Sequence, residues 1–348
     1  MSSKNASQPW RRILRLSLVQ QEGAIVALLL LVIACTVISP DFLTHRNLYD
    51  LADQIPIYAM LAAAQMLVIV SGGIDLSVGS LVVVGAFFAA TQSFNSTPQA
   101  IAIALLATGL LGMINGIVIA YTRIPPFIVT LGMLSVARGV ALEATSIYHG
   151  QSVAAGGAQP VGAIQHGSFI FISQGTLFGV PFPAYLAAGV FLVLAYTLHF
   201  TRFGRHVFAL GGNEAAADLL GVRVARVKIA IYTFSGLLSG FAGVLLASRL
   251  SSAPPTEGLG WELDSITAVV IGGTLLTGGV GTVRGTLAGL LFINILPNIF
   301  NLTGVDPSWQ LVVRGGVLLA VVIFQVRLVP STRIGGLQLG TEPNRPGS

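Results

Sequence analysis

The sequence is dominated by apolar segments that recur along almost its whole length. Hydrophobic residues make up 54% of the 348 positions and charged residues only 9%, whereas a soluble domain carries about 25% charged residues. The segments approach the roughly 20 apolar residues that a helix needs to cross a bilayer, and they lack the strict alternation of membrane strands. The sequence therefore predicts an all-α polytopic membrane protein with about ten transmembrane helices, of which the shorter ones are tilted, broken or re-entrant. The segments are residues 23–39, 56–71, 77–93, 98–121, 127–142, 182–200, 229–248, 264–277, 285–303 and 308–326.

Basic residues indicate how these segments are oriented. If the N-terminus is cytoplasmic and every segment crosses, all but four of the 18 lysines and arginines fall on the cytoplasmic side. This distribution is what the positive-inside rule predicts. The agreement supports both the number of crossings and the orientation. The four exceptions are Arg46, Arg138, Arg249 and Arg314.

This orientation divides the chain into a membrane domain and two tails. We expect a basic cytoplasmic tail at 1–22, a membrane domain at 23–326 and a cytoplasmic C-terminal tail at 327–348. Polar loops at about 143–181 and 250–262 would face the opposite side, where a soluble protein could dock. The first apolar segment ends in SPDF rather than at a small-residue cleavage site, so we interpret it as a retained span and not as a signal peptide.

The charge and the metal-ligating residues exclude several functions. The net charge of +5 arises from short basic clusters between apolar segments, with no interleaved aromatic residues, so we expect no nucleic-acid partner. Cys35 is the only cysteine, which excludes a disulfide within the chain and a thiolate metal site. The five histidines show no ligand spacing, so no metal is expected.

The segment 201–228 is the longest expected cytoplasmic loop. Within it, Asn213 can cap a helix, Glu214 complements the helix dipole, and Gly221 can end the helix. A helix of two turns is too short to be stable alone in water. We therefore expect it to pack against the ends of its own spans or in a groove of a partner. The residues assigned to this coupling loop are Gly212, Asn213, Glu214, Ala215, Ala216, Asp218, Leu220 and Gly221.

Asp75 is the only charged residue between Asp53 and Arg123 and lies in the stretch GGIDLSVGS (72–80). A carboxylate that caps a broken or re-entrant helix satisfies amide groups that are costly to leave unpaired near lipid. The alternative is that this cap also lines a transport pathway, because irregular backbone at membrane depth is found mainly at cavities.

Other polar residues inside the expected spans are also candidates for a pathway or a helix cap. Ionisable groups there usually face a bundle interior or a water-filled route. Arg314 is the strongest pathway candidate, and its alternative is a structural pair with an acid such as Asp264. For Asp264 itself, a cap at the outer end of a span is the default interpretation. The full set is Asp75, Asn115, Arg138, Asp264, Asn294, Gln310 and Arg314.

Motifs for catalysis are absent. A P-loop requires GxxxxGK[ST], but the two lysines, Lys4 and Lys228, do not follow a glycine. GGVGTVRG (278–285) has an arginine where a dinucleotide turn needs its third glycine, and we interpret it as a tight turn. There is no HExxH and no GxSxG, which leaves an intramembrane enzyme without a metal or a nucleophile. We expect no catalytic residue and no cofactor bound by this chain.

Three stretches together resemble the ribose-type monosaccharide permeases of ATP-binding cassette (ABC) importers, in the branched-chain amino acid/ribose permease superfamily. They are GGIDLSVGS (72–80), GRHVFALGGNEAAADLLGV (204–222) and ELDSITAVVIGGTLLTGGVGTVRGT (262–286), and the resemblance extends from about residue 24 to 326. The glutamate-alanine-alanine triplet that starts at Glu214 resembles the coupling loop of these permeases. The resemblance implies a multi-pass protein of the bacterial inner membrane that works as a homodimer or with a sister permease.

The same resemblance implies the partners. They are cytoplasmic ATPase subunits, which use ATP and Mg, and a periplasmic sugar-binding protein. The expected cargo is a monosaccharide, with a ribose-like pentose favoured. The alternative is an ion- or proton-coupled secondary carrier, which would transport its solute without an ATPase.

Overall fold

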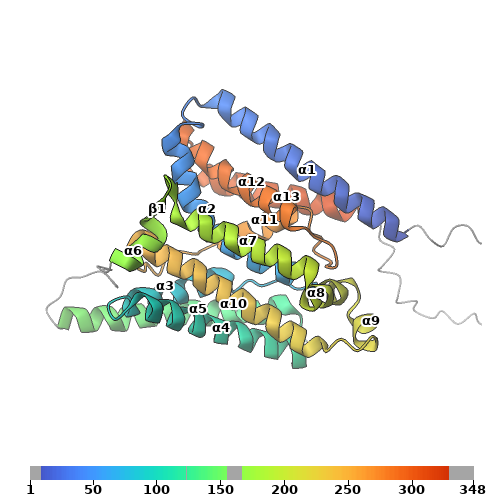
Figure 1. The fold of residues 1–348 in the computed structure, drawn as a ribbon, viewed down its shortest axis with the longest axis horizontal. Coiled ribbons are helices and arrows are strands. Elements are labelled where there is room, and N and C mark those ends of the chain that lie inside the picture. The colour runs from blue at the N-terminus through green and yellow to red at the C-terminus, as the bar shows by residue number, and fades with distance from the viewer. Residues whose placement is uncertain (1–8, 123, 155–166, 329–348) are drawn as a thin grey trace, which may run out of the picture.

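The computed structural model describes residues 9–122, 124–154 and 167–328, and these are almost entirely helical (Figure 1). A two-stranded antiparallel hairpin, β1 (Thr176–Leu177) and β2 (Val180–Pro181), is the only sheet in this part of the chain. The helices are α1 (Pro9–Ile38), α2 (His45–Val70), α3 (Val78–Gln92), α4 (Thr97–Thr122), α5 (Pro126–Ala154), α6 (Gly167–Gln174), α7 (Phe182–Phe200), α8 (Arg202–Gly212), α9 (Glu214–Leu219), α10 (Val224–Leu250), α11 (Trp261–Ile271), α12 (Val283–Thr303) and α13 (Pro307–Leu328).

The core of the bundle is built on α10, which packs against α4, α3 and α2. Small residues allow the close approach that membrane helices use in place of a hydrophobic driving force. Gly112 of α4 lies so near α10 that a Cβ there would meet the carbonyl oxygen of Tyr232. Gly236 of α10 is matched in the same way against the carbonyl of Thr108. Gly116 and Gly240, four residues further along each helix, also lie against the opposite helix, so the four glycines allow α4 and α10 to pack closely.

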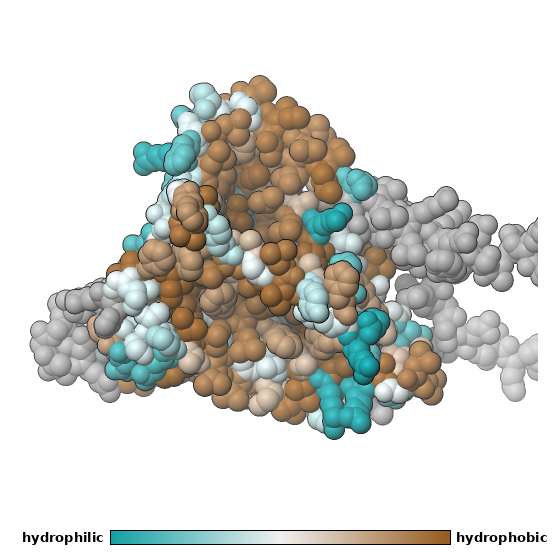
Figure 2. Space-filling view, in the orientation of Figure 1, coloured by the Kyte–Doolittle hydropathy of each residue, from teal (hydrophilic) through white to brown (hydrophobic). Residues whose placement is uncertain are grey.

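The outer surface of the bundle is apolar over its middle (Figure 2). Large aliphatic and aromatic side chains on α1, α5, α7 and α13 are exposed, including Leu30, Leu131, Leu192 and Leu311. Six described helices are long and apolar enough to cross a bilayer: α2, α4, α5, α7, α10 and α12. Shorter apolar helices lie at Glu22–Ile38, Val78–Gln92 and Pro307–Ile323. The prediction of an all-α polytopic membrane protein is confirmed.

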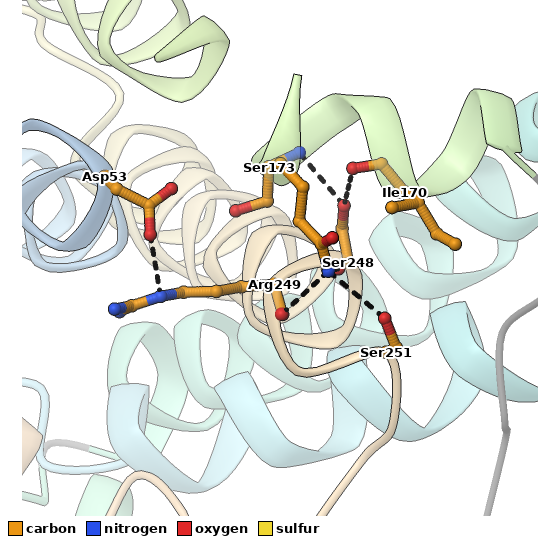
Figure 3. A network of polar contacts seen from close by, with 7 residues as sticks. Asp53, Ile170, Ser173, Ser248, Arg249 and Ser251 are labelled. Carbon is orange, nitrogen blue, oxygen red and sulfur yellow. Dashed lines mark hydrogen bonds and ion pairs between the residues drawn. The ribbon is translucent and has the colours of Figure 1, made fainter. Parts of the chain in front are cut away.

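The two ends of the bundle differ. The helices α8 and α9 lie at one end, together with the beginning of α1, and we call this the α9 end (Figure 1). The helix α6 and the β hairpin lie at the opposite end, which we call the α6 end. There Ser248 ties α10 to α6, accepting a hydrogen bond from the Ser173 amide at 3.0 Å and donating to the Ile170 carbonyl (Figure 3). Arg249 forms an ion pair with Asp53 at 2.9 Å in the same region.

Helix boundaries differ from the expectation at three places. The helix α5 continues to Ala154, through residues that we expected to begin a loop, and α1 begins at Pro9, within the expected N-terminal tail. The helix α8 was not predicted; Thr201 caps it by accepting a hydrogen bond from the Gly204 amide. The second part of the expected loop forms α6 and the β hairpin. Residues 155–166 of this loop, and residues 1–8 and 329–348 of the expected tails, lie outside the described residues.

The segment 251–260 folds back into the bundle instead of lying on its surface as a loop. The Arg138 guanidinium of α5 donates hydrogen bonds to the carbonyls of Pro255, at 2.9 Å, and Glu257, at 2.7 Å. Ala253 is buried, and Gly258 lies against Gly79 near the start of α3. The following helix α11 has only 11 residues, about 16 Å at the usual helical rise, which is too short to cross a hydrocarbon core of about 30 Å.

The close contact between α4 and α10 predicts a steric sensitivity at Gly112. The Gly112→Val variant should unfold in detergent at a lower temperature, because overpacking a core costs about 1–3 kcal/mol. Gly189→Val in α7 is the matched control, since nothing lies within 4 Å of a Cβ at Gly189. Equal midpoint temperatures for the two variants would show that the contact does not hold the bundle together.

Candidate functional site: a glycine junction and the broken helices

Three backbone turns from distant parts of the sequence meet near the α9 end. We define the glycine junction as Gly72, Gly211, Gly212, Gly278 and Gly279. The Gly279 amide donates a hydrogen bond of 2.8 Å to the carbonyl oxygen of Val70, the last residue of α2. Gly211, near the C-terminal end of α8, lies against the same carbonyl. The junction thus joins the ends of α2 and α8 to the turn between α11 and α12.

Glycine is required at two positions of the junction, Gly211 and Gly279, for different reasons. A Cβ at Gly211 would collide with the Val70 carbonyl oxygen, so no other residue allows this approach. Gly279 has a φ of 75°, in the left-handed region that side chains disfavour. The three stretches 72–80, 204–222 and 262–286, which are far apart in the sequence, each contribute to the junction.

The short helix predicted after Asn213 is present as α9. The Asn213 side chain accepts a hydrogen bond of 3.0 Å from the Ala216 amide and so caps the helix. Gly221 follows it with a φ of 82° and allows the chain to turn towards α10. Lys228 of α10 holds α9 through an ion pair of 2.7 Å with Glu214.

The outer surface of α9 is not covered by any other part of the chain that the structure describes. Leu219 and Leu220 are 89% and 84% exposed, although both are large apolar side chains. Beside them is a hollow of about 700 Å³ between α4, α9 and α10. Its lining includes the acids Glu214 and Asp218 and the bases Arg223 and Arg226. An exposed apolar tip beside a charged hollow is suited to a protein–protein contact.

Asp75 lies in the break between α2 and α3 and is fully buried. One carboxylate oxygen accepts hydrogen bonds from the Ser77 amide, at 2.9 Å, and the Ser77 hydroxyl, at 2.6 Å. The other accepts a bond of 2.7 Å from the hydroxyl of Ser235 on α10. The amide of Asn115 donates to the Ser77 hydroxyl at 3.1 Å, which adds α4 to the network. The carboxylate therefore ties the broken helix to α10 and, through Ser77, to α4.

Asp75 does not occupy the N-cap position that we expected. The helix α3 begins at Val78 and its N-cap is Ser77. Asp75 instead pairs with the amide of that cap residue, in a turn that precedes the helix. Thr130 of α5 supports the same turn by accepting a hydrogen bond from the Leu76 amide at 3.1 Å.

Arg314 forms an ion pair with Asp264 at 2.9 Å, as the structural alternative proposed. The prediction that Asp264 caps a helix is wrong: the N-cap of α11 is Gly260, and the Asp264 side chain contacts α13. The cap interpretation was wrong because the chain enters α11 through the returning segment 251–260. The helix α13 then packs beside the first turn of α11, where it contacts Asp264.

Three of the four arginines that departed from the charge pattern therefore have partners inside the protein. Arg249 and Arg314 are paired with aspartates, and Arg138 is bonded to backbone carbonyls. Such internal pairing is how membrane proteins accommodate a charge within a span. These three exceptions thus have a structural explanation, and they mark where α2, α5 and α11 are fixed to their neighbours.

The remaining candidates are separate from these networks. Asn294 donates a hydrogen bond to the Leu290 carbonyl of its own helix, at 2.8 Å. Gln310 donates to the Asn301 side chain at 2.9 Å and joins the end of α12 to the start of α13. The structure therefore brings Asp75 together with Asn115, and Asp264 with Arg314, but it does not form one continuous polar lining from all seven residues.

Sequence analysis missed Ser77, Thr130 and Ser235 as members of the Asp75 network. Ser235 and Ser239 lie four residues apart on α10, next to Gly236 and Gly240. A stripe of small and polar residues in an apolar segment is a signal for a buried helix face. No comparable signal points to Thr130, which contacts the turn only because α5 crosses it.

The fold and these networks define a polytopic helical membrane protein in which the turns that follow α2 and α11 meet α8, next to the short helix α9 at one end of the bundle. The family described as branched-chain amino acid transport system / permease component matches residues 47–322, and the chain belongs to this family. No solved structure matches.

Several relatives are similar over most of their length. The chain is 39% identical to the ribose import permease protein RbsC of Escherichia coli K12, over 90% of this chain and 96% of the relative. It is 39% identical to RbsC of Bacillus subtilis, over 87% and 92% of the two chains. It is 37% identical to the L-arabinose ABC transporter permease protein AraH of Azospirillum brasilense, over 88% of each.

The Asp75 network predicts different effects for two substitutions. Asp75→Ala leaves the buried Ser77 amide without its acceptor, at a cost of about 1–3 kcal/mol, and should lower the unfolding midpoint in detergent. Asp75→Asn keeps one carbonyl oxygen for that amide, so its midpoint should fall less. Ser93→Ala is the control, because the hydroxyl of this buried serine bonds only within its own helix. Equal midpoints for Asp75→Ala and Asp75→Asn would contradict the role of the Asp75 side chain as acceptor for the Ser77 amide.

Proposed function

We propose that the chain is the membrane-spanning subunit of an ATP-driven importer of a monosaccharide, with a ribose-like pentose as cargo. The support comes from the family and from relatives named for ribose and L-arabinose import. The single structural observation that supports the mechanism is the glycine junction. It connects the exposed helix α9, through α8, to the break between α2 and α3 and to the turn between α11 and α12. The ion-coupled carrier has no comparable support.

The proposed motor is a separate ATPase that contacts α9. Leu219 and Leu220 would insert into an apolar groove of this partner, and the neighbouring hollow with Asp218 and Arg223 would provide charged contacts. Exposed leucines of this kind lose unfavourable contact with water when they are covered. The chain itself binds no nucleotide in this proposal; ATP and Mg belong to the partner.

The glycine junction would transmit an ATP-driven displacement of α9 to the membrane-spanning helices. A displacement of α9 moves Gly212, which directly precedes its cap residue, and hence Gly211 against the end of α2 and the Gly278–Gly279 turn. These turns lie next to the Asp75 break and at the start of α12. Side chains at such a contact could change rotamer and absorb the displacement. Because backbone packs directly against backbone here, the displacement would be transmitted.

The pathway would be hydrated and only sparsely polar. Sugars are neutral and costly to strip of water, so a route that stays wet needs few specific groups. A periplasmic binding protein would then supply the selectivity. The internal contacts of Arg138 and of the Arg314–Asp264 pair would fix the helices that surround this route. A second copy of the chain or a sister permease would form the other side of the route. The α9 end and both termini would be cytoplasmic, in a bacterial inner membrane.

The proposed contact with the ATPase predicts the effect of a charge on α9. Replacing Leu219 and Leu220 by aspartate should abolish co-purification of the ATPase encoded with this permease, because two apolar anchors become carboxylates that cannot be desolvated cheaply. ATP-dependent uptake of radiolabelled ribose into cells should fall to background. Pull-down of the tagged permease and uptake measure the two effects in the same strain.

A matched control uses the other end of the molecule. Phe178 is 92% exposed in the β hairpin at the α6 end, so Phe178→Asp should leave ATPase co-purification intact. Full co-purification and normal uptake with both leucines replaced would remove α9 from the mechanism. Uptake of ribose by the purified chain alone in liposomes with an ion gradient would replace the importer by a secondary carrier.

A further inference from the structure

A large apolar groove lies on the outside of the bundle, away from the networks described above. Its volume is about 1220 Å³, and it runs between α1, α2, α7 and α12. The surface in this region is apolar, as the space-filling view shows (Figure 2). The walls are formed by alanines on α7 and by leucines on α2 and α12, among them Ala188, Leu51 and Leu287.

The groove is polarised along its length. Arg284, in the first turn of α12, and His199, in the last turn of α7, line it at the α9 end. At the other end its lining includes Phe42, Leu48 and Ala184, with no charged residue. Arg284 is exposed, and within the described part of the chain no carboxylate forms an ion pair with it. One end of the groove is therefore cationic and the rest is apolar.

The dimensions of the groove suit a lipid. Along α7 the lining extends from Ala184 to Phe200, about 24 Å at the helical rise per residue. This length fits within the hydrocarbon core of a bilayer, which is about 30 Å thick. In a membrane an apolar groove that opens to the outside fills with acyl chains, and a basic residue at its end attracts an anionic headgroup.

We propose that this groove binds one anionic phospholipid, with its acyl chains between α2, α7 and α12 and its phosphate at Arg284. Thr282 and the first amides of α12 lie next to the phosphate, at a helix start where the dipole favours a negative charge. The proposal depends on the membrane-embedded fold and on charge complementarity, not on the identity of the transported solute.

The site would place the lipid next to the glycine junction. Thr282 caps α12 by accepting a hydrogen bond of 3.2 Å from the Gly285 amide, and it follows closely on the junction residues Gly278 and Gly279 in the same turn. A bound headgroup would therefore restrain the turn through which α12 meets the junction.

Native mass spectrometry of the purified full-length chain tests the site. The protein is taken from nanodiscs that contain equal amounts of phosphatidylglycerol and phosphatidylcholine with identical acyl chains. The wild type should retain one phosphatidylglycerol in preference to phosphatidylcholine. Arg284→Gln should reduce this preference about tenfold, as the loss of one charge-assisted hydrogen bond implies. Ala188→Trp, which places a large side chain in the wall of the groove and narrows it, should reduce the retention of both lipids.

Arg226→Gln is the matched control, because Arg226 is exposed at the start of α10 but does not line the groove; it should retain the wild-type preference. Monodisperse elution of every variant confirms that it is folded. Equal retention of the two lipids by the wild type, or an unchanged preference in Arg284→Gln, would overturn the proposal. Unchanged lipid retention in Ala188→Trp, with loss of a dimer, would assign the groove to a second copy and also overturn it.

Discussion

The contact of Gly211 and Gly279 with the carbonyl oxygen of Val70 is the constraint on which the account depends. It brings the backbone of three segments within hydrogen-bonding or van der Waals distance, with no side chain between them. Because α2 ends at this contact and α12 begins four residues after Gly279, we propose that a displacement of α8 and α9 is passed to the ends of these two helices. The apolar spans around the junction would hold it in place, and the exposed leucines of α9 would provide an apolar contact surface for a partner.

Charged groups inside the bundle have a related role. Asp75 holds the α2–α3 break against α10, while Arg138 holds the returning segment 251–260 against α5. A buried charge left unpaired is costly, so each of these groups restricts how its helix can move. A movement of the bundle would therefore have to preserve these contacts or break them.

The apolar segments predicted the helical spans well, because in a bilayer hydropathy and length largely decide which residues form a helix. The cap at Asn213 and the turn at Gly221 were also predictable, since helix ends are local features. The junction could not be predicted from the sequence, because three Gly-Gly pairs in separate segments do not show which of them lie in contact in the folded protein. The same reason explains the error at Asp264: its partner is on α13, and a local rule for helix starts cannot identify a contact between distant helices. Hydropathy also missed α8, whose mixed composition resembles that of a loop.

The most direct test of the central claim is the number of sugar molecules transported per ATP hydrolysed by the complete reconstituted transporter. Gly211→Ala adds a methyl group that collides with the Val70 carbonyl, whereas a methyl group at Gly212 meets nothing within 4 Å. If the junction transmits the movement, this ratio falls severalfold further for Gly211→Ala than for Gly212→Ala while ATP hydrolysis continues. An equal ratio for the two variants would mean that the force reaches the broken helices by another route.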